Sequence, residues 1–216
     1  MTLRLFYHPL SSFSHKVLTA LYENDTAFEP CLLGHGNAAI DDEFRRLWPI
    51  AKMPIVRDEA RGLTVVESTT IIEYLGQHYP GPTQLIPSDP ELGRQVRFYD
   101  RFFDFYVHQP MQKIVTDKLR PAGKSDAFGV EQAHATLTLA YDVLEREVAG
   151  KTWIAGDAFT LADCAAAPPL YFANRLHPLT DARPNASAYF SRLLARPSYA
   201  RALRDAEPFL MSIHSP

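Results

Sequence analysis

Four prolines between positions 80 and 90 divide this chain of 216 residues into two parts: Pro80, Pro82, Pro87 and Pro90. Because proline lacks a backbone N–H and fixes φ, neither a long helix nor a central strand can run through such a stretch. We therefore expect a linker over residues 81–90, a first domain over residues 1–80 and a second domain over residues 91–216. Each part is long enough to bury a core of its own.

Strand and helix patterns alternate before the linker. Short apolar runs predict strands at residues 3–7, 28–33, 55–58 and 63–66. Helical spacing of apolar residues predicts helices at residues 14–23, at 43–48 and after Ser68, which we place as an N-cap. The first two strands flank a helix and should pair in parallel, whereas the last two flank a turn at Gly62 and should pair antiparallel. The first domain should therefore contain a mixed four-stranded sheet.

Only helical patterns follow the linker. The helix expected over residues 95–107 is rich in aromatic residues, namely Phe98, Tyr99, Phe102, Phe103, Phe105 and Tyr106. Further helices are expected at residues 132–148, from Thr160 onward, at 185–195 and at 198–206. The helix from Thr160 contains Pro168-Pro169 and should kink or end early. The predicted fold class is α/β followed by all-α.

Composition and charge exclude several kinds of protein. A formal net charge of -3 gives no basic face, so we expect no nucleic-acid partner. The apolar runs are too short to span a membrane and the first residues lack a signal-peptide profile, so we expect a cytoplasmic location. Cys31 and Cys164 lie far apart, and the histidines form no H-x-x-x-H pair, so we expect neither a disulfide nor a metal site. Both cysteines should be buried as small apolar residues.

Four motifs follow one another along the chain: Tyr7-His8-Pro9-Leu10-Ser11-Ser12-Phe13-Ser14, Lys52-Met53-Pro54, Glu67-Ser68 and Thr160-Leu161-Ala162-Asp163. With these motifs in this order, the chain resembles the cytosolic glutathione transferases over essentially its full length. The last of these looks like the N-capping box of the buried C-terminal helix of the family. The resemblance implies a thioredoxin-like N-terminal domain, a C-terminal helical bundle, glutathione as co-substrate without a metal, and a homodimer.

A hydroxyl group at the start of the first helix is the expected activator of glutathione. The reacting species must be a thiolate, which a hydroxyl donor near the positive end of a helix stabilises. The resemblance points to Ser11 for this role, with Ser12 next and Tyr7 as a competitor, because some classes use a tyrosine near the end of the first strand. Alternatively, the serines only cap the helix.

The same loop disfavours two other chemistries. Ser11 and Ser14 take the spacing of a CxxC motif, but a hydroxyl cannot form a mixed disulfide, so thiol–disulfide exchange is not expected. Phe13 occupies the position of the cysteine in the zeta-class isomerase pattern, which argues against isomerase activity.

Two further motifs are expected to bind the ends of glutathione. In the family the peptide bond before Pro54 is cis, and the backbone of Met53 would pair with the cysteinyl part, while Lys52 would meet the glycyl carboxylate. Glu67 would pair with the γ-glutamyl ammonium, and Ser68 would receive the γ-glutamyl carboxylate at a helix start. The alternative is that the first segment only starts an edge strand and the second only caps a helix.

An apolar pocket for the second substrate is expected from Leu10, Phe13, Phe102 and Tyr106. Most of the aromatic residues at 98–106 should nevertheless fill the helical core. Five polar residues are weaker candidates for contacts with glutathione, the first three of them across a dimer interface: Asp100, Arg101, Asp104, His35 and Asn37.

These features predict a glutathione S-transferase that joins the thiolate to a small apolar electrophile. The same site could reduce organic hydroperoxides. The alternative is a non-catalytic scaffold of the same fold that binds glutathione or another ligand, because fold alone does not fix function. Ionisation of bound glutathione near neutral pH distinguishes the enzyme from the scaffold.

Overall fold

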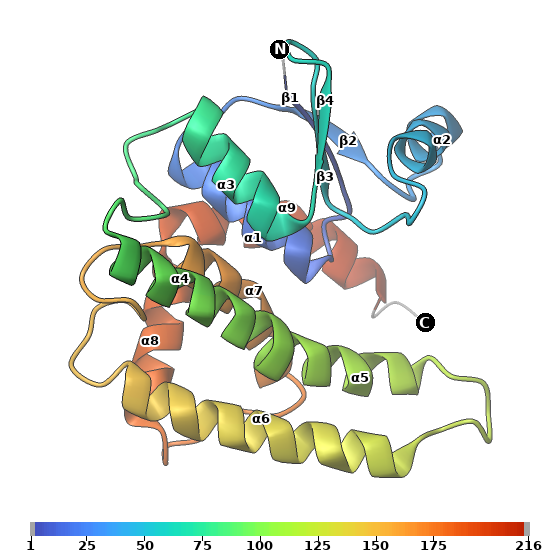
Figure 1. The fold of residues 1–216 in the computed structure, drawn as a ribbon. Coiled ribbons are helices and arrows are strands. Elements are labelled where there is room, and N and C mark those ends of the chain that lie inside the picture. Colours follow the sequence, from blue (N-terminus) through green and yellow to red (C-terminus); the bar gives the residue numbers. More distant parts are fainter. Residues whose placement is uncertain (1–2, 214–216) are drawn as a thin grey trace. The chain divides into compact units, whose positions relative to one another are not determined.

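The computed structural model describes residues 3–213, and the chain forms two compact units (Figure 1). Residues 3–86 and 196–213 make up the first unit, and residues 87–195 make up the second. The first change of unit falls within the stretch expected to be a linker. The end of the chain differs from expectation, because residues 196–213 group with the first unit and not with the helical one.

The sheet of the first unit has the strand order β2-β1-β3-β4. Its strands are β1 (Leu3–Tyr7), β2 (Glu29–Leu32), β3 (Ile55–Asp58) and β4 (Leu63–Val66). β1 pairs in parallel with β2 and antiparallel with β3, and β3 pairs antiparallel with β4. The predicted mixed four-stranded sheet is therefore confirmed.

Four helices belong to this unit: α1 (Ser12–Glu23), α2 (Ala38–Leu47), α3 (Ser68–His78) and α9 (Pro197–Ile213). Figure 1 shows α1 and α3 on one side of the sheet and α2 on the other. α2 begins earlier than residue 43 because the Asn37 side chain caps it, accepting a hydrogen bond from the Ile40 N–H at 3.4 Å.

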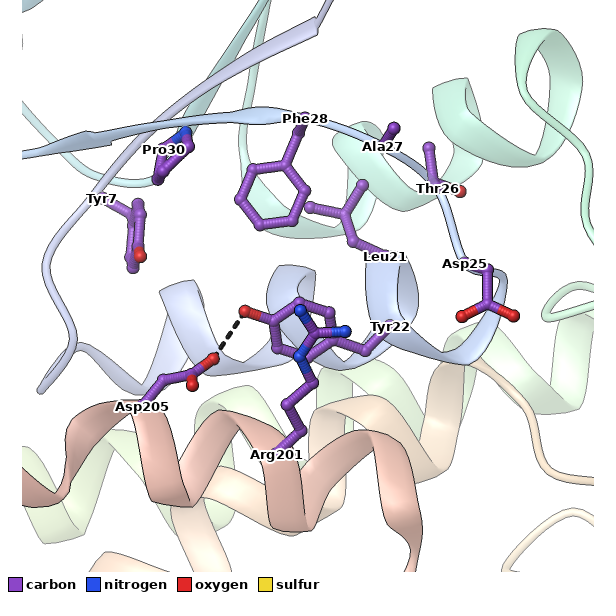
Figure 2. Close-up of a pocket in the computed structure, with 10 residues that line it drawn as sticks. All are labelled: Tyr7, Leu21, Tyr22, Asp25, Thr26, Ala27, Phe28, Pro30, Arg201 and Asp205. Atoms are coloured by element: carbon purple, nitrogen blue, oxygen red, sulfur yellow. Dashed lines mark hydrogen bonds between the residues drawn. The ribbon is translucent and has the colours of Figure 1, made fainter.

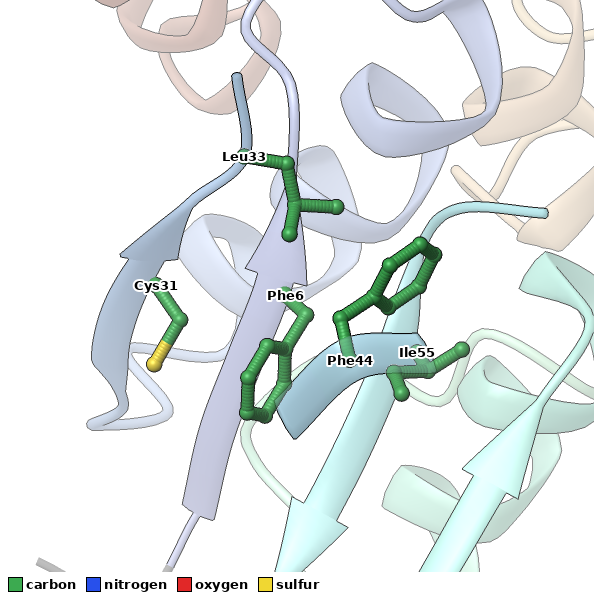
Figure 3. Packing of buried hydrophobic residues seen from close by; sticks show 5 residues of the cluster. All are labelled: Phe6, Cys31, Leu33, Phe44 and Ile55. Atoms are coloured by element: carbon green, nitrogen blue, oxygen red, sulfur yellow. The ribbon is translucent and has the colours of Figure 1, made fainter. Parts of the chain in front are cut away.

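The sheet is buried on both faces, so neighbouring residues of β1 enter different cores. Leu5 and Phe6 are both completely buried, and successive side chains of a strand point to opposite faces. On the α2 face, Phe6 packs with Cys31, Phe44 and Ile55 (Figure 3). Cys31 and Cys164 are free and buried, as expected from the sequence.

A buried carboxylate joins α9 to α1. Glu23, at the end of α1, accepts hydrogen bonds from Ser198 at 2.7 Å and Thr83 at 3.1 Å, and it forms an ion pair with Arg196. Burial alone would raise the pKa of Glu23, but these donors and the Arg196 charge outweigh burial and lower it. The start of α9 is thereby held in the first unit.

The second unit is helical, as predicted. It contains α4 (Pro90–Phe102), the π-helix η1 (Phe103–His108), α5 (Gln109–Lys118), α6 (Ala127–Glu147), α7 (Leu161–Asn174) and α8 (Pro184–Ala195). No helix between residues 3 and 213 is both long and apolar enough to cross a membrane.

The aromatic residues of α4 and η1 do not mainly fill the core, contrary to expectation. Tyr99, Phe102 and Phe103 are buried, but Phe98, Phe105 and Tyr106 are each about half exposed. Rings at nearly consecutive positions of a helix point in all directions around its axis. One face of α4 and η1 packs against α7, so the remaining rings face outward.

The α7 helix continues through Pro168 and Pro169 to Asn174, so it does not end early. The predicted capping box at its start is confirmed. The Asp163 carboxylate accepts hydrogen bonds from the Thr160 N–H at 2.9 Å and the Thr160 hydroxyl at 3.1 Å. It also accepts the Ile154 N–H at 3.1 Å and the Tyr189 hydroxyl at 2.7 Å. Asp163 is completely buried.

Candidate functional site

Three strand ends meet at one edge of the sheet and bring the motifs of the first unit together. Phe6 is paired with Ile55, and Ile55 is paired with Val66. The end of β1, the start of β3 and the end of β4 therefore lie side by side. The three motifs adjoin these strand ends, at residues 11–14, 52–54 and 67–68.

Ser11 is the N-cap of α1. Its hydroxyl oxygen accepts the Ser14 N–H at 3.3 Å, and its own N–H donates to the His8 carbonyl at 3.0 Å. A hydroxyl that accepts from the helix still has its hydrogen to donate. Ser11 is partly exposed, so its O–H can reach an anion in front of the positive end of α1. Ser12 is the first residue of the helix and only 8% exposed, which makes it the less accessible candidate.

Tyr7 lines a cavity together with residues of α1 and α9. Burial raises the pKa of its phenol, and the nearby charge of Asp205 raises it further. Tyr7 is thus a weaker acid than an ordinary tyrosine. Its side chain lines the cavity beside α9, whereas the Ser11 hydroxyl lies at the start of α1.

The segment before β3 has the predicted backbone, because the Met53–Pro54 peptide bond is cis. Pro54 is buried and Met53 packs against the core cluster on the α2 face of the sheet. Lys52 is exposed, so its ammonium group is accessible to a ligand.

The start of α3 differs by one residue from the prediction. Glu67, and not Ser68, is the N-cap, and Ser68 is the first helical residue. The Glu67 side chain makes no capping hydrogen bond and is exposed, so the first N–H groups of α3 are not capped by that carboxylate. The φ of Glu67 is 67°, a left-handed conformation that residues other than glycine seldom adopt and that occurs preferentially at functional sites.

Lys16 is a buried cation near the site that the sequence reasoning did not identify. Its side chain is 1% exposed, and its ammonium group donates to the Thr69 hydroxyl at 3.0 Å. This bond places a positive charge between α1 and the first turn of α3. The signal was present in the sequence, because Lys16 lies among the apolar positions that form the inner face of α1.

His15 connects the loop before α1 to the helix. Its Nε2 lies 2.5 Å from the Pro9 carbonyl, and a carbonyl can only accept, so Nε2 carries the hydrogen. His15 is completely buried. Burial lowers its pKa to about 4, although the Pro9 hydrogen bond and the Asp205 charge act in the opposite direction.

Acid should therefore destabilise the folded chain through His15. Between pH 6.5 and about 4 the unfolded histidine binds a proton that the folded histidine does not, so stability falls as the pH falls. We expect a loss of about 3 kcal/mol from this group. Urea unfolding of the wild type and His15→Gln over this pH range measures it, because glutamine does not titrate. If the free energies of unfolding of the wild type and of His15→Gln fall equally with pH, the loss cannot be assigned to His15.

The residues predicted to line a pocket for the second substrate come from both units. Leu10 and Phe13 are partly exposed residues of the first unit. Phe102 and Tyr106 belong to the second unit, where their ring centroids lie 5.6 Å apart. A common pocket of these four residues stays a prediction.

The weaker candidates for glutathione contacts already have partners within the chain. Arg101 pairs with Asp100 at 2.9 Å and with Asp104 at 2.5 Å. His35 stacks on His8 with 5.4 Å between ring centroids, and Asn37 caps α2. Contacts of these residues with glutathione stay predictions. Within residues 3–213, no three His, Cys, Asp or Glu side chains form a group that could hold a metal ion.

Both parts of the chain match known family models. Residues 5–83 match the model described as glutathione S-transferase, N-terminal domain, and residues 101–197 match glutathione S-transferase, C-terminal domain. A Fusarium protein named glutathione S-transferase-like protein LUC7 is 34% identical over 158 residues, which covers 73% of this chain and 71% of that protein.

Two further comparisons cover nearly the whole chain. FtsZ-localized protein A of Caulobacter vibrioides is 28% identical, covering 95% of this chain and 92% of that protein. The structure of a glutathione S-transferase from Methylobacterium radiotolerans in complex with glutathione sulfonate is 25% identical, with a TM-score of 0.81 and coverage of 94% of each chain.

Proposed function

Because the chain belongs to the glutathione S-transferase family, we propose that it binds glutathione where β1, β3 and β4 meet and activates it as a thiolate for attack on a small apolar electrophile. The observation that carries this proposal is the convergence of three motifs at one edge of the sheet, with the Ser11 hydroxyl in front of α1. The similar structure with bound glutathione sulfonate supports glutathione as the ligand.

In the proposed complex, each end of glutathione would meet a group of complementary charge at this edge. The first N–H groups of α3, at Ser68, suit the γ-glutamyl carboxylate, and the Lys16 cation below them adds a favourable charge. The exposed Glu67 carboxylate suits the γ-glutamyl ammonium. Lys52 suits the glycyl carboxylate, and the Met53 backbone suits the cysteinyl part.

The Ser11 hydroxyl would donate a hydrogen bond to the glutathione sulfur, and the positive end of α1 would add to this effect. Both stabilise the thiolate over the thiol, so the thiol proton is lost to solvent near neutral pH. The sulfur then forms a bond to the electrophilic atom, and either a leaving group departs as its anion or an activated double bond opens and takes up a proton from solvent. A hydroperoxide is a second acceptor: the thiolate attacks one oxygen and breaks the O–O bond, which gives the sulfenic acid of glutathione and, after protonation, an alcohol. A second glutathione thiol then displaces the sulfenic hydroxyl as water and forms glutathione disulfide.

A non-catalytic scaffold is the second candidate function. It is favoured by the likeness to FtsZ-localized protein A, because that name describes a location and not a transfer reaction. A scaffold needs affinity for glutathione or another ligand but does not need to ionise the thiol. A homodimer and a cytoplasmic location stay predictions under either function.

The pKa of bound glutathione tests the proposal and separates the two functions. Titration of the thiolate ultraviolet absorbance should give a pKa well below that of a free thiol, about 8.5 for cysteine. In Ser11→Ala the bound thiol pKa should rise by about one unit or more, because the hydrogen bond to sulfur is lost. Ser191→Ala is the matched control, since Ser191 is an exposed serine of α8.

The other outcomes are equally informative. A low pKa that Ser11→Ala leaves unchanged and Ser12→Ala raises would keep the enzyme and move the role to Ser12. If neither change affects a low pKa, Tyr7→Phe is the next variant. No binding, or binding with an unshifted thiol pKa, would reject the transferase in favour of the scaffold.

A further inference from the structure

A cavity of about 430 Å³ lies in the first unit and shares Tyr7 with the first motif of the candidate glutathione site. It is bounded by α1, the segment that leads into β2, and α9 (Figure 2). Its lining residues are Tyr7, Leu21, Tyr22, Asp25, Thr26, Ala27, Phe28, Pro30, Arg201 and Asp205. Tyr22 is ten residues beyond Ser12 on α1, which corresponds to roughly 15 Å along the helix. Apart from Tyr7, the cavity is thus near the end of α1, whereas the other residues of the glutathione motifs surround its start.

The walls of this cavity suit a flat aromatic ring. The rings of Tyr22 and Phe28 lie 6.0 Å apart between centroids. Figure 2 shows Pro30 and Phe28 on one side of the opening, Tyr22 on the opposite side and Tyr7 at one end. Aromatic rings pack well against such surfaces, and pockets of a few hundred Å³ bind small organic molecules.

Arg201 provides a cationic group at the same cavity. Its guanidinium carbon lies 4.0 Å from the centroid of the Tyr22 ring. Within residues 3–213, Arg201 has no hydrogen bond or ion pair, and its neighbour Asp205 instead accepts the Tyr22 hydroxyl at 2.6 Å. A stacked guanidinium keeps its N–H groups available and matches the geometry of a carboxylate.

Tyr7 provides a second polar group that lacks a protein partner. Its side chain is only 7% exposed and is directed from β1 toward α9 (Figure 2). No residue of the described chain forms a hydrogen bond with its hydroxyl. Tyr7 lines the cavity, so a ligand group that pairs with its hydroxyl gains a hydrogen bond. The Tyr7 phenol stays protonated because burial and the charge of Asp205 raise its pKa.

We propose that this cavity binds a small aromatic monocarboxylate that also carries a hydroxyl group. Its ring packs along the wall formed by Phe28 and Pro30, its carboxylate pairs with Arg201, and its hydroxyl lies near Tyr7 and Asp205. The ligand should carry only one negative charge, because Asp25 and Asp205 also line the cavity and would repel a second one. The hydroxyl of the ligand can donate to Asp205 and accept from Tyr7.

Calorimetric titration of the full chain with 4-hydroxybenzoate tests this site. The titration is run with S-hexylglutathione at saturation, so that the glutathione site and the adjoining space are filled. We expect binding in its presence, and about tenfold weaker binding of 4-hydroxybenzamide, which lacks the charge. Arg201→Gln should weaken the binding of 4-hydroxybenzoate by about tenfold and should weaken the binding of 4-hydroxybenzamide much less. Arg204→Gln, an exposed arginine of the same helix outside the cavity, should leave both unchanged.

Tyr7→Phe provides a second variant, because it removes only the hydroxyl. It should weaken the binding of 4-hydroxybenzoate by about threefold to tenfold. The binding of benzoate, which has no hydroxyl to pair with Tyr7, should weaken less. Absence of 4-hydroxybenzoate binding, loss of binding when S-hexylglutathione is present, or equal effects of the Arg201 and Arg204 variants would overturn the proposal. None of these outcomes depends on thiolate formation, so failure here is distinguishable from failure of the transferase.

Discussion

Replacing Asp163 by alanine is expected to lower the free energy of unfolding by about 4 kcal/mol. The carboxylate accepts hydrogen bonds from two backbone N–H groups and two hydroxyls, at Ile154, Thr160 and Tyr189. The carboxylate that accepts these hydrogen bonds is completely buried. Alanine leaves these donors without an acceptor and without access to water, so their full desolvation penalty is incurred. The start of α7 also loses its capping box.

Urea unfolding followed by far-ultraviolet circular dichroism measures this loss. Asp157→Ala is the matched control, because Asp157 is an exposed acid in the loop before the same helix and should change stability by less than about 0.5 kcal/mol. Asp163→Asn should fall between the two, since its amide keeps one acceptor oxygen but turns two N–H donors toward groups that also donate. Equal stability of the Asp163 and Asp157 variants would refute the role assigned to the cap.

Glu23→Ala is expected to destabilise the first unit by about 3 kcal/mol. The change removes the acceptor of Thr83 and Ser198 and the ion pair between Glu23 and Arg196. The Glu23 side chain is only 7% exposed, so the two hydroxyls lose their acceptor at a place that water reaches poorly. The loss should be concentrated at the contact of α9 with the end of α1.

Hydrogen exchange detects where this loss occurs. Amides of residues 197–213 should exchange faster in Glu23→Ala than in the wild type, while amides of α6 in the second unit should change little. Glu207→Ala is the control, because Glu207 is an exposed acid on α9. Uniform acceleration across both units, or none at all, would show that Glu23 is not what holds α9.

Local patterns were sufficient for the sheet and for the position of the motifs. Apolar runs identified the strands and the turn at Gly62 identified the antiparallel pair, and both features depend on residues close together in the sequence. The cis bond before Pro54, which the structure contains, was implied by the family resemblance. Once strand order is known, pairing alone brings the motifs to one edge.

Features that depend on distant residues were not predictable in the same way. α9 belongs to the first unit through contacts between positions as far apart as Glu23 and Ser198. The cavity also joins Tyr7 to Arg201, which share no local pattern. The shift of the α3 cap from Ser68 to Glu67 reflects a backbone conformation, φ of 67°, that residue type alone would disfavour.

The return of the chain to its first unit has a consequence during synthesis. Residues 87–195 interrupt the first unit, which is completed only by residues 196–213. A ribosome releases the N-terminal end first, so the sheet emerges long before the helix that covers α1. The apolar surface of α1 that α9 covers therefore stays exposed to water and to chaperones while the inserted helices are translated. Residues 196–213 thus complete a unit whose strands are translated more than a hundred residues earlier.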